Sequence, residues 1–189
     1  MLSAVSAIHT LRMDVLGADS FELLVVVIAC TFPALLSLAA VGDVLRYLIP
    51  NTLCLGLALL AIPAMALSGA DVTTILWHGV VGMLVLVVVS LLFFRGMIGG
   101  GDVKLLAAAA IWTGWPLIVP LLIYTACAGG LIAVALLLAR RCTRNREFQQ
   151  AWLGKLLNPS SGLPYGVAIA IAGWIVWFRL PIFSTAFPT

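Results

Sequence analysis

Long apolar stretches without a single charged side chain dominate this sequence. They run from residue 23 to 41, from 52 to 68, and from 72 to 94, where His78 is the one interruption. A helix needs about 20 such residues to cross a bilayer, and only helices and closed barrels satisfy their backbone hydrogen bonds there. Because the apolar residues are continuous rather than alternating, we expect membrane-spanning helices.

Three further helices are expected toward the C-terminus. The uncharged stretch over 105–139 is too long for one helix in a bilayer core of about 30 Å. A hairpin at Gly114-Trp115-Pro116 divides it and leaves a short helix over roughly 103–113, and a last run covers 162–178. The predicted fold is an all-α polytopic bundle of about six transmembrane helices with a short fourth helix, in a single domain over 1–189.

The composition excludes several other classes of protein. Hydrophobic residues make up 63% of the chain and charged residues 9%, against about 45–50% and about 25% in soluble domains. A net charge of +3 is too small to indicate a nucleic-acid partner. The four cysteines lie far apart, without a CxxC pair or zinc spacing, so we expect no metal site.

The basic residues predict which helix ends face the cytoplasm. With six helices, the loops after the first, third and fifth share one side and hold eight of the ten Lys and Arg residues. The positive-inside rule then places both termini outside. The basic loop 140–155 is interpreted as a topology determinant that also touches anionic lipid head groups. The eight residues are Arg46, Arg95, Lys104, Arg140, Arg141, Arg144, Arg146 and Lys155.

Two acidic residues, Asp43 and Asp102, fall at the cytoplasmic ends of predicted helices, with Asp43 two residues beyond the first. Acidic groups in such places are costly unless paired or hydrated, so they are functional candidates. Of two close carboxyl groups, one takes a proton from water while the other donates one to a carbonyl oxygen. This is aspartic peptidase chemistry, which needs no metal or cofactor. Two alternatives stay open: Asp102 is a helix cap, and Asp43 is an interfacial charge near Arg46.

The residues around the two aspartates also carry information. Three glycines, Gly99, Gly100 and Gly101, precede Asp102. Glycine permits close backbone approach, which suits a loop that admits an extended peptide. The alternative interpretation is that the three glycines form a purely structural loop. Pro50 follows Asp43 and fits the first turn of the second helix.

Three motifs in order resemble those of the type IV prepilin peptidases, in the short form associated with tight-adherence (Flp) pili. One GxGD motif alone would be weak, because presenilin-like proteases also carry it, but the three together are specific. They are Gly42-Asp43 with Ile49-Pro50-Asn51, then Gly99-Gly100-Gly101-Asp102-Val103-Lys104-Leu105, and finally Leu163-Pro164-Tyr165-Gly166.

The resemblance implies a membrane aspartic endopeptidase in the inner (plasma) membrane of a prokaryote. It would remove the short basic leader of prepilins or pseudopilins at the cytoplasmic face, with Asp43 and Asp102 as catalytic residues. Without a CxxC pair or the extra cytoplasmic segment of larger relatives, N-methyltransferase activity is not expected. The residues expected to bind substrate or support the site are Gly99, Gly100, Gly101, Lys104, Pro50, Asn51, Pro164, Tyr165 and Gly166.

Other functions remain open at this point. An archaeal preflagellin-type peptidase would use the same pair of aspartates. A small proton-coupled transporter would place acids near mid-bilayer between two related halves, and a non-catalytic pilus-assembly scaffold would tolerate neutral residues at both positions. Lys104 is alternatively an interfacial charge that reaches the head groups. The sequence leaves open the pilin, the oligomeric state and which aspartate is the acid.

Overall fold

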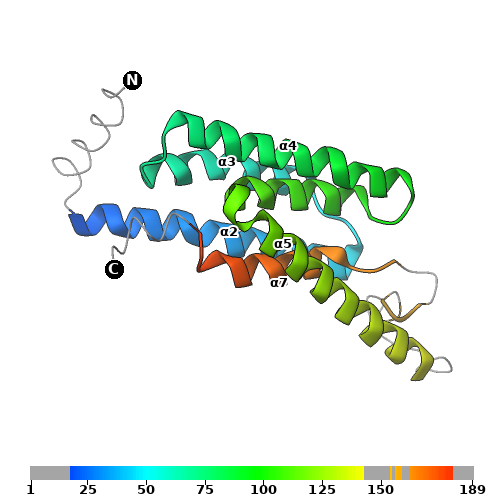
Figure 1. Ribbon diagram of the computed structural model, residues 1–189. Coiled ribbons are helices and arrows are strands. Elements are labelled where there is room, and N and C mark those ends of the chain that lie inside the picture. The colour runs from blue at the N-terminus through cyan, green and yellow to red at the C-terminus, as the bar shows by residue number, and fades with distance from the viewer. Residues whose placement is uncertain (1–17, 143–153, 155, 159–161, 181–189) are drawn as a thin grey trace.

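The computed structural model describes residues 18–142, 154, 156–158 and 162–180, with side chains from residue 23 onward. This part of the chain contains helices and no strand, so the expected all-α class is confirmed (Figure 1). Most of the basic loop 140–155 and the residues before 18 lie outside the described residues. The helices are α2 (Ala18–Arg46), α3 (Asn51–Leu67), α4 (Val72–Phe94), α5 (Gly100–Cys142) and α7 (Tyr165–Trp177).

The expected count of about six spanning helices is not confirmed. Among the described residues, 3 helices are long and apolar enough to cross a membrane: Leu23–Arg46 of α2, all of α4, and all of α5. Helices α3, with 17 residues, and α7, with 13, are apolar but shorter. The predicted fourth and fifth helices form the two arms of α5, which is why the helices are fewer than expected.

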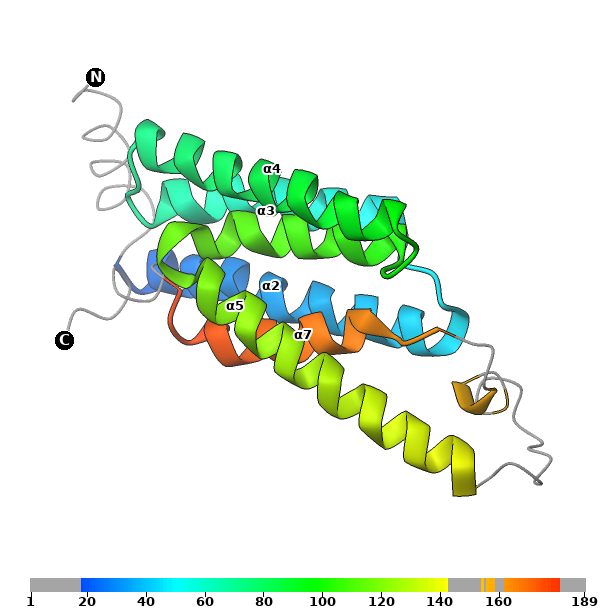
Figure 2. The same ribbon diagram turned by 45° about the vertical axis from the view of Figure 1, so that its right-hand side comes forward.

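The two arms of α5 meet at the predicted hairpin position. Gly114 has φ 55° and ψ −165°, outside the helical region and in a range that favours glycine. A β-carbon added there would lie 2.4 Å from Nε2 of His78, and Nδ1 of His78 lies 2.7 Å from the Ile111 carbonyl oxygen. The second arm turns away from the first (Figure 2). The break at Gly114 is therefore confirmed, and the buried His78 packs into it.

The first arm of α5, residues 100–113, is the centre of the bundle. At about 1.5 Å per residue it is about 21 Å long, shorter than a bilayer core of about 30 Å. Its Ala107, Ala108, Ala109 and Ala110 are all buried, and small residues of this kind allow helices to approach closely. Helices α3 and α4 pack on α5, and α7 packs on both α5 and α2.

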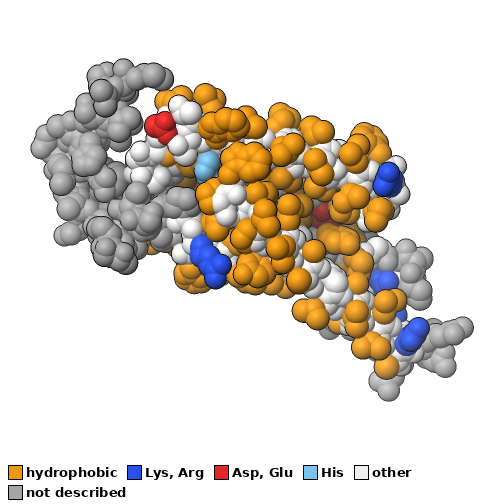
Figure 3. All heavy atoms as spheres, in the orientation of Figure 1, with side chains coloured by type: hydrophobic (Ala, Val, Ile, Leu, Met, Phe, Trp, Pro, Cys, Tyr) orange, Lys and Arg blue, Asp and Glu red, His pale blue; other side chains and the backbone are white. Residues whose placement is uncertain are grey.

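Large apolar side chains also cover the outside of the bundle. Leu38, Leu55, Leu76, Met83 and Leu131 are each at least half exposed. Figure 3 shows apolar side chains along most of the visible helical surface. A soluble protein rarely exposes so large an apolar area, whereas lipid chains make a suitable solvent for it. The surface therefore agrees with a protein embedded in a membrane.

Candidate active site

Asp43 lies inside α2, in its last turn, and not beyond the helix as predicted. The backbone N–H of Tyr47 donates to the Asp43 carbonyl oxygen at 2.8 Å, so the helical pattern continues past the carboxylate. Tyr47 then takes a positive φ of 53°, a conformation that commonly ends helices. The prediction was wrong because it ended the helix at Val41, the last residue of the uncharged run, whereas the helical backbone hydrogen bonds continue past the charged side chain of Asp43.

Asp102 lies in the first turn of α5, three residues after Gly99. A β-carbon added at Gly99 would lie 2.9 Å from Oδ2 of Asp102, so a side chain there would press on the carboxyl group. Gly100 and Gly101 belong to the helix, where they face Phe93 and Ile49 at close range. The glycines thus let the neighbouring elements and the Asp102 carboxyl group approach the start of α5 closely.

The start of α7 contacts Asp43. The backbone N–H of Gly166 donates to Oδ2 of Asp43 at 2.7 Å, and a β-carbon at Gly166 would lie 2.9 Å from the same oxygen. Pro164 is buried at the N-cap of this helix. The positive end of the helix dipole and the free N–H groups favour an anion at this place. The C-terminal motif therefore holds one carboxyl group of the site.

Both aspartates line one cavity of about 490 Å³. Asp43 is only 5% exposed and Asp102 only 8%, so the protein shields both from bulk water. The carboxyl groups interact electrostatically with each other, and Asp102 also interacts with the Gly166 amide. Within the described residues, Oδ1 of Asp102 is buried and has no hydrogen-bond partner. A buried polar atom of this kind is costly, which marks it as a group available to a ligand.

Several residues that line this cavity were missed by sequence reasoning. Tyr47 follows α2, and burial raises the pKa of its hydroxyl group above the usual value, although the nearby Arg140 opposes the shift. The phenol therefore stays protonated at neutral pH. A single tyrosine after an apolar run gives no signal in the sequence that it lines a cavity. The other missed residues are Gly96, Met97, Ile98 and Gly162, which come from the segments before α5 and α7. Leu163 also lines the cavity; it belongs to the third motif but was not among the expected site residues.

Arg140, near the end of α5, connects several segments beside the cavity by hydrogen bonds. Its Nε and Nη2 donate to the Leu156 carbonyl oxygen at 3.2 and 2.9 Å, and Nη2 also donates to the Gly162 carbonyl oxygen at 3.2 Å. It also interacts with Tyr47. The sequence had been interpreted only as placing this residue in a loop that sets membrane topology and touches anionic lipid head groups. In the structure its guanidinium joins α5 to the segment that precedes α7.

Some of the predicted supporting residues lie elsewhere. Nζ of Lys104 donates to Oδ1 of Asn51 at 2.9 Å, and both residues line a different cavity between α3, α4 and α5. Pro50 is the N-cap of α3. Successive residues of a helix are about 100° apart, so Lys104 points to almost the opposite side of α5 from Asp102. Among the predicted supporting residues, Gly99 and Tyr165 line the aspartate cavity.

The described residues contain no group of three or more His, Cys, Asp or Glu side chains that could hold a metal ion. The carboxyl pair suits proton transfer to and from a water molecule placed between the two groups.

One comparison with known proteins found a match. A model of the type IV leader peptidase family matches residues 30–134, more than half of the chain. The matched range includes both aspartates and the three glycines before Asp102, and it ends before Pro164. The comparisons with curated proteins and with solved structures found no significant match.

Proposed function

Because the chain belongs to the type IV leader peptidase family, we propose that it is a membrane aspartic endopeptidase that cleaves prepilins or pseudopilins. Family membership indicates a peptidase. The observation that carries the aspartic mechanism is the single cavity that both Asp43 and Asp102 line, although they come from α2 and α5. Two shielded carboxyl groups that interact with each other are the arrangement that this chemistry requires.

The pair would activate water as follows. The ionised carboxyl group takes a proton from water, and the water oxygen attacks the scissile carbonyl carbon. The protonated carboxyl group donates its proton to the carbonyl oxygen, giving a neutral tetrahedral intermediate. Collapse of this intermediate breaks the C–N bond. The leaving amine takes a proton from the carboxyl group that deprotonated water, and a hydroxyl group of the intermediate gives a proton to the other carboxyl group. The pair therefore carries one proton before and after the reaction, and its titration is shared between both residues.

The substrate would enter the cavity as an extended segment. Met97 and Ile98 on one side and Leu163 on another supply apolar contacts for residues beside the scissile bond. The short basic leader would lie in the cytoplasm and the hydrophobic helix of the prepilin in the membrane. The expected lack of N-methyltransferase activity is part of the proposal and rests on the absence of a CxxC pair from the sequence.

The charges near the site support a cytoplasmic location in the plasma membrane. Arg46 ends α2, Arg95 follows α4 and Lys104 lies in the first arm of α5. All three lie toward the same end of the helical bundle as the two aspartates. Basic residues at one side of a membrane protein favour the cytoplasm. That is the side on which the leader of a newly made prepilin is exposed.

The proposal is tested by co-expression with candidate prepilins, with leader removal followed by mass spectrometry. We expect Asp43→Asn and Asp102→Asn each to lower cleavage at least about 100-fold at matched membrane levels. Asp71→Asn is the matched control, because it makes the same chemical change at the exposed N-cap of α4, where asparagine also caps well. If both site variants still cleave, the aspartic mechanism is wrong. If the wild type leaves every prepilin uncut, the proposed substrate class is wrong, and the transporter and scaffold become the functions to test.

A further inference from the structure

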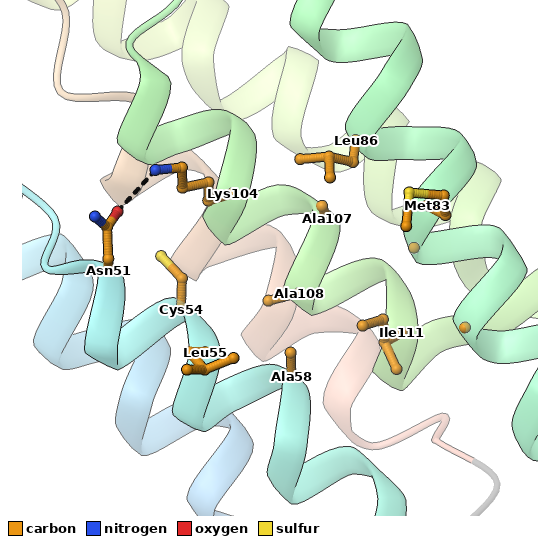
Figure 4. Close-up of a pocket in the computed structure, with 12 residues that line it drawn as sticks. Asn51, Cys54, Leu55, Ala58, Met83, Leu86, Lys104, Ala107, Ala108 and Ile111 are labelled. Atoms are coloured by element: carbon orange, nitrogen blue, oxygen red, sulfur yellow. Dashed lines mark hydrogen bonds between the residues drawn. The ribbon is translucent and has the colours of Figure 1, made fainter.

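A second cavity, of about 310 Å³, lies between α3, α4 and α5 and is separate from the aspartate cavity. Figure 4 shows its lining, with Lys104 and Asn51 at one end and Ala58 and Ile111 toward the other. Apart from Lys104 and Asn51, the side chains that line it are apolar. The proposed peptidase chemistry uses none of it.

This cavity has the form of a groove that opens toward the membrane. Helices α3 and α4 each pack on α5 far more than on one another, which leaves a gap between them. Small residues, among them Ala108 and Gly79, line the groove, while Leu55 and Met83 are 59% and 60% exposed. A β-carbon added at Gly79 would meet nothing within 4 Å. The groove is therefore hollow and accessible from the lipid phase.

The charge at the end of the groove has no counter-charge. Lys104 donates to Asn51, which is neutral, and no acidic side chain in the described part of the chain pairs with it. An ammonium group has three donors, so two remain for another ligand. A lysine at the membrane surface attracts anionic lipid head groups, and its apolar stem can lie along the groove.

We propose that this groove binds one acyl chain of an anionic phospholipid, with the lipid phosphate held by Lys104. The size of the groove favours this occupant over a helix of a partner protein. A spanning helix is about 10 Å wide and about 30 Å long, which requires far more space than 310 Å³. A single acyl chain is narrow enough, and its phosphate would reach the helix turn that also carries Asp102. This binding does not depend on the proposed peptidase activity.

Native mass spectrometry of the purified full chain tests the proposal. The probes are phosphatidylglycerol and phosphatidylcholine with identical acyl chains. We expect the wild type to retain one phosphatidylglycerol in preference to phosphatidylcholine. Lys104→Gln should reduce that preference about fivefold, since it removes the direct ion pair between the ammonium group and the lipid phosphate, which contributes about 1 kcal/mol. Gly79→Leu should reduce retention of both lipids, because its side chain fills the groove.

Two matched controls separate the groove from general surface effects. Arg95→Gln removes a basic residue after α4, outside the groove lining. Gly130→Leu makes the same change as Gly79→Leu at another exposed helical glycine with open space around it. Both should bind lipid as the wild type does. The proposal is overturned if Gly79→Leu retains lipid normally, or if Arg95→Gln lowers the preference as much as Lys104→Gln. It is also overturned if Gly79→Leu leaves lipid bound and instead weakens prepilin binding, which would indicate a substrate groove.

Discussion

The two cavities beside the start of α5 differ in lining and in access. The cavity at Asp102 is lined by two shielded carboxyl groups and by residues from three segments of the chain, while the groove at Lys104 is mostly apolar and open to lipid. Only Val103 separates these two residues in the sequence. Because a helix turns about 100° per residue, one short motif serves both faces. Residues two positions apart in a motif therefore need not share a site, and substitutions that affect the two cavities separately should test this difference.

Among substitutions that leave both aspartates in place, the largest effect on the aspartate cavity is expected from Gly166→Val. The new side chain would lie within 3 Å of Asp43 and displace its carboxyl group, and a shift of about 1 Å can cost about 100-fold in rate. We expect kcat for prepilin cleavage to fall about 100-fold while lipid retention stays at the wild-type level. Gly130→Val is the control, since its surroundings are open. Equal losses of kcat in both variants would contradict the assigned contact.

A smaller effect is expected from Arg140→Ala. The change removes the hydrogen bonds to the Leu156 and Gly162 carbonyl oxygens, each worth about 1.5–3 kcal/mol when the donor is charged. The segment before α7 should loosen, raising KM for prepilin about tenfold and increasing protease sensitivity near residue 158. Arg141→Ala, one residue further along α5, provides the comparison in both measurements. An unchanged KM would show that Arg140 does not shape the cavity.

The smallest effect is expected from Tyr47→Phe. Burial raises the pKa of this hydroxyl group above its usual value of about 10. The phenol is therefore protonated at every pH below about 10. Loss of the hydroxyl should lower kcat/KM a few-fold, because a hydrogen bond contributes about 1 kcal/mol. The pH profile between pH 5 and pH 9 should keep its shape. A shifted limb in that range would mean that Tyr47 titrates during cleavage.

Much of the fold could be predicted from the sequence, because hydropathy and length act locally. The uncharged runs located α3 and α4 to within a residue or so. The length of the run after Asp102 required a break, and Gly114 is the residue whose conformation permits it. The number of spanning helices was less accessible, since length and composition do not show how far each helix crosses the membrane.

The pairing of the aspartates rested on two facts visible in the sequence: acids at membrane edges are costly, and both belong to recognisable motifs. The other residues that line or support the cavity could not be predicted in the same way. Arg140 reaches segments 16 and 22 positions away, and Tyr47 enters the cavity only because α2 ends there in a left-handed turn. Such contacts depend on tertiary packing. The roles of the remaining motif residues stay predictions.

The most direct test of the account is whether Asp43 and Asp102 act as one unit. The measurement is kcat/KM for prepilin cleavage in proteoliposomes by the two Asp→Asn variants and by the double variant. If the two residues form one catalytic pair, each single change should cost at least about 100-fold. The double change should then cost little more than the more severe single change, because residues that act as a unit are strongly non-additive. Losses that multiply in the double variant, or a single variant that cleaves like the wild type, would contradict the shared mechanism.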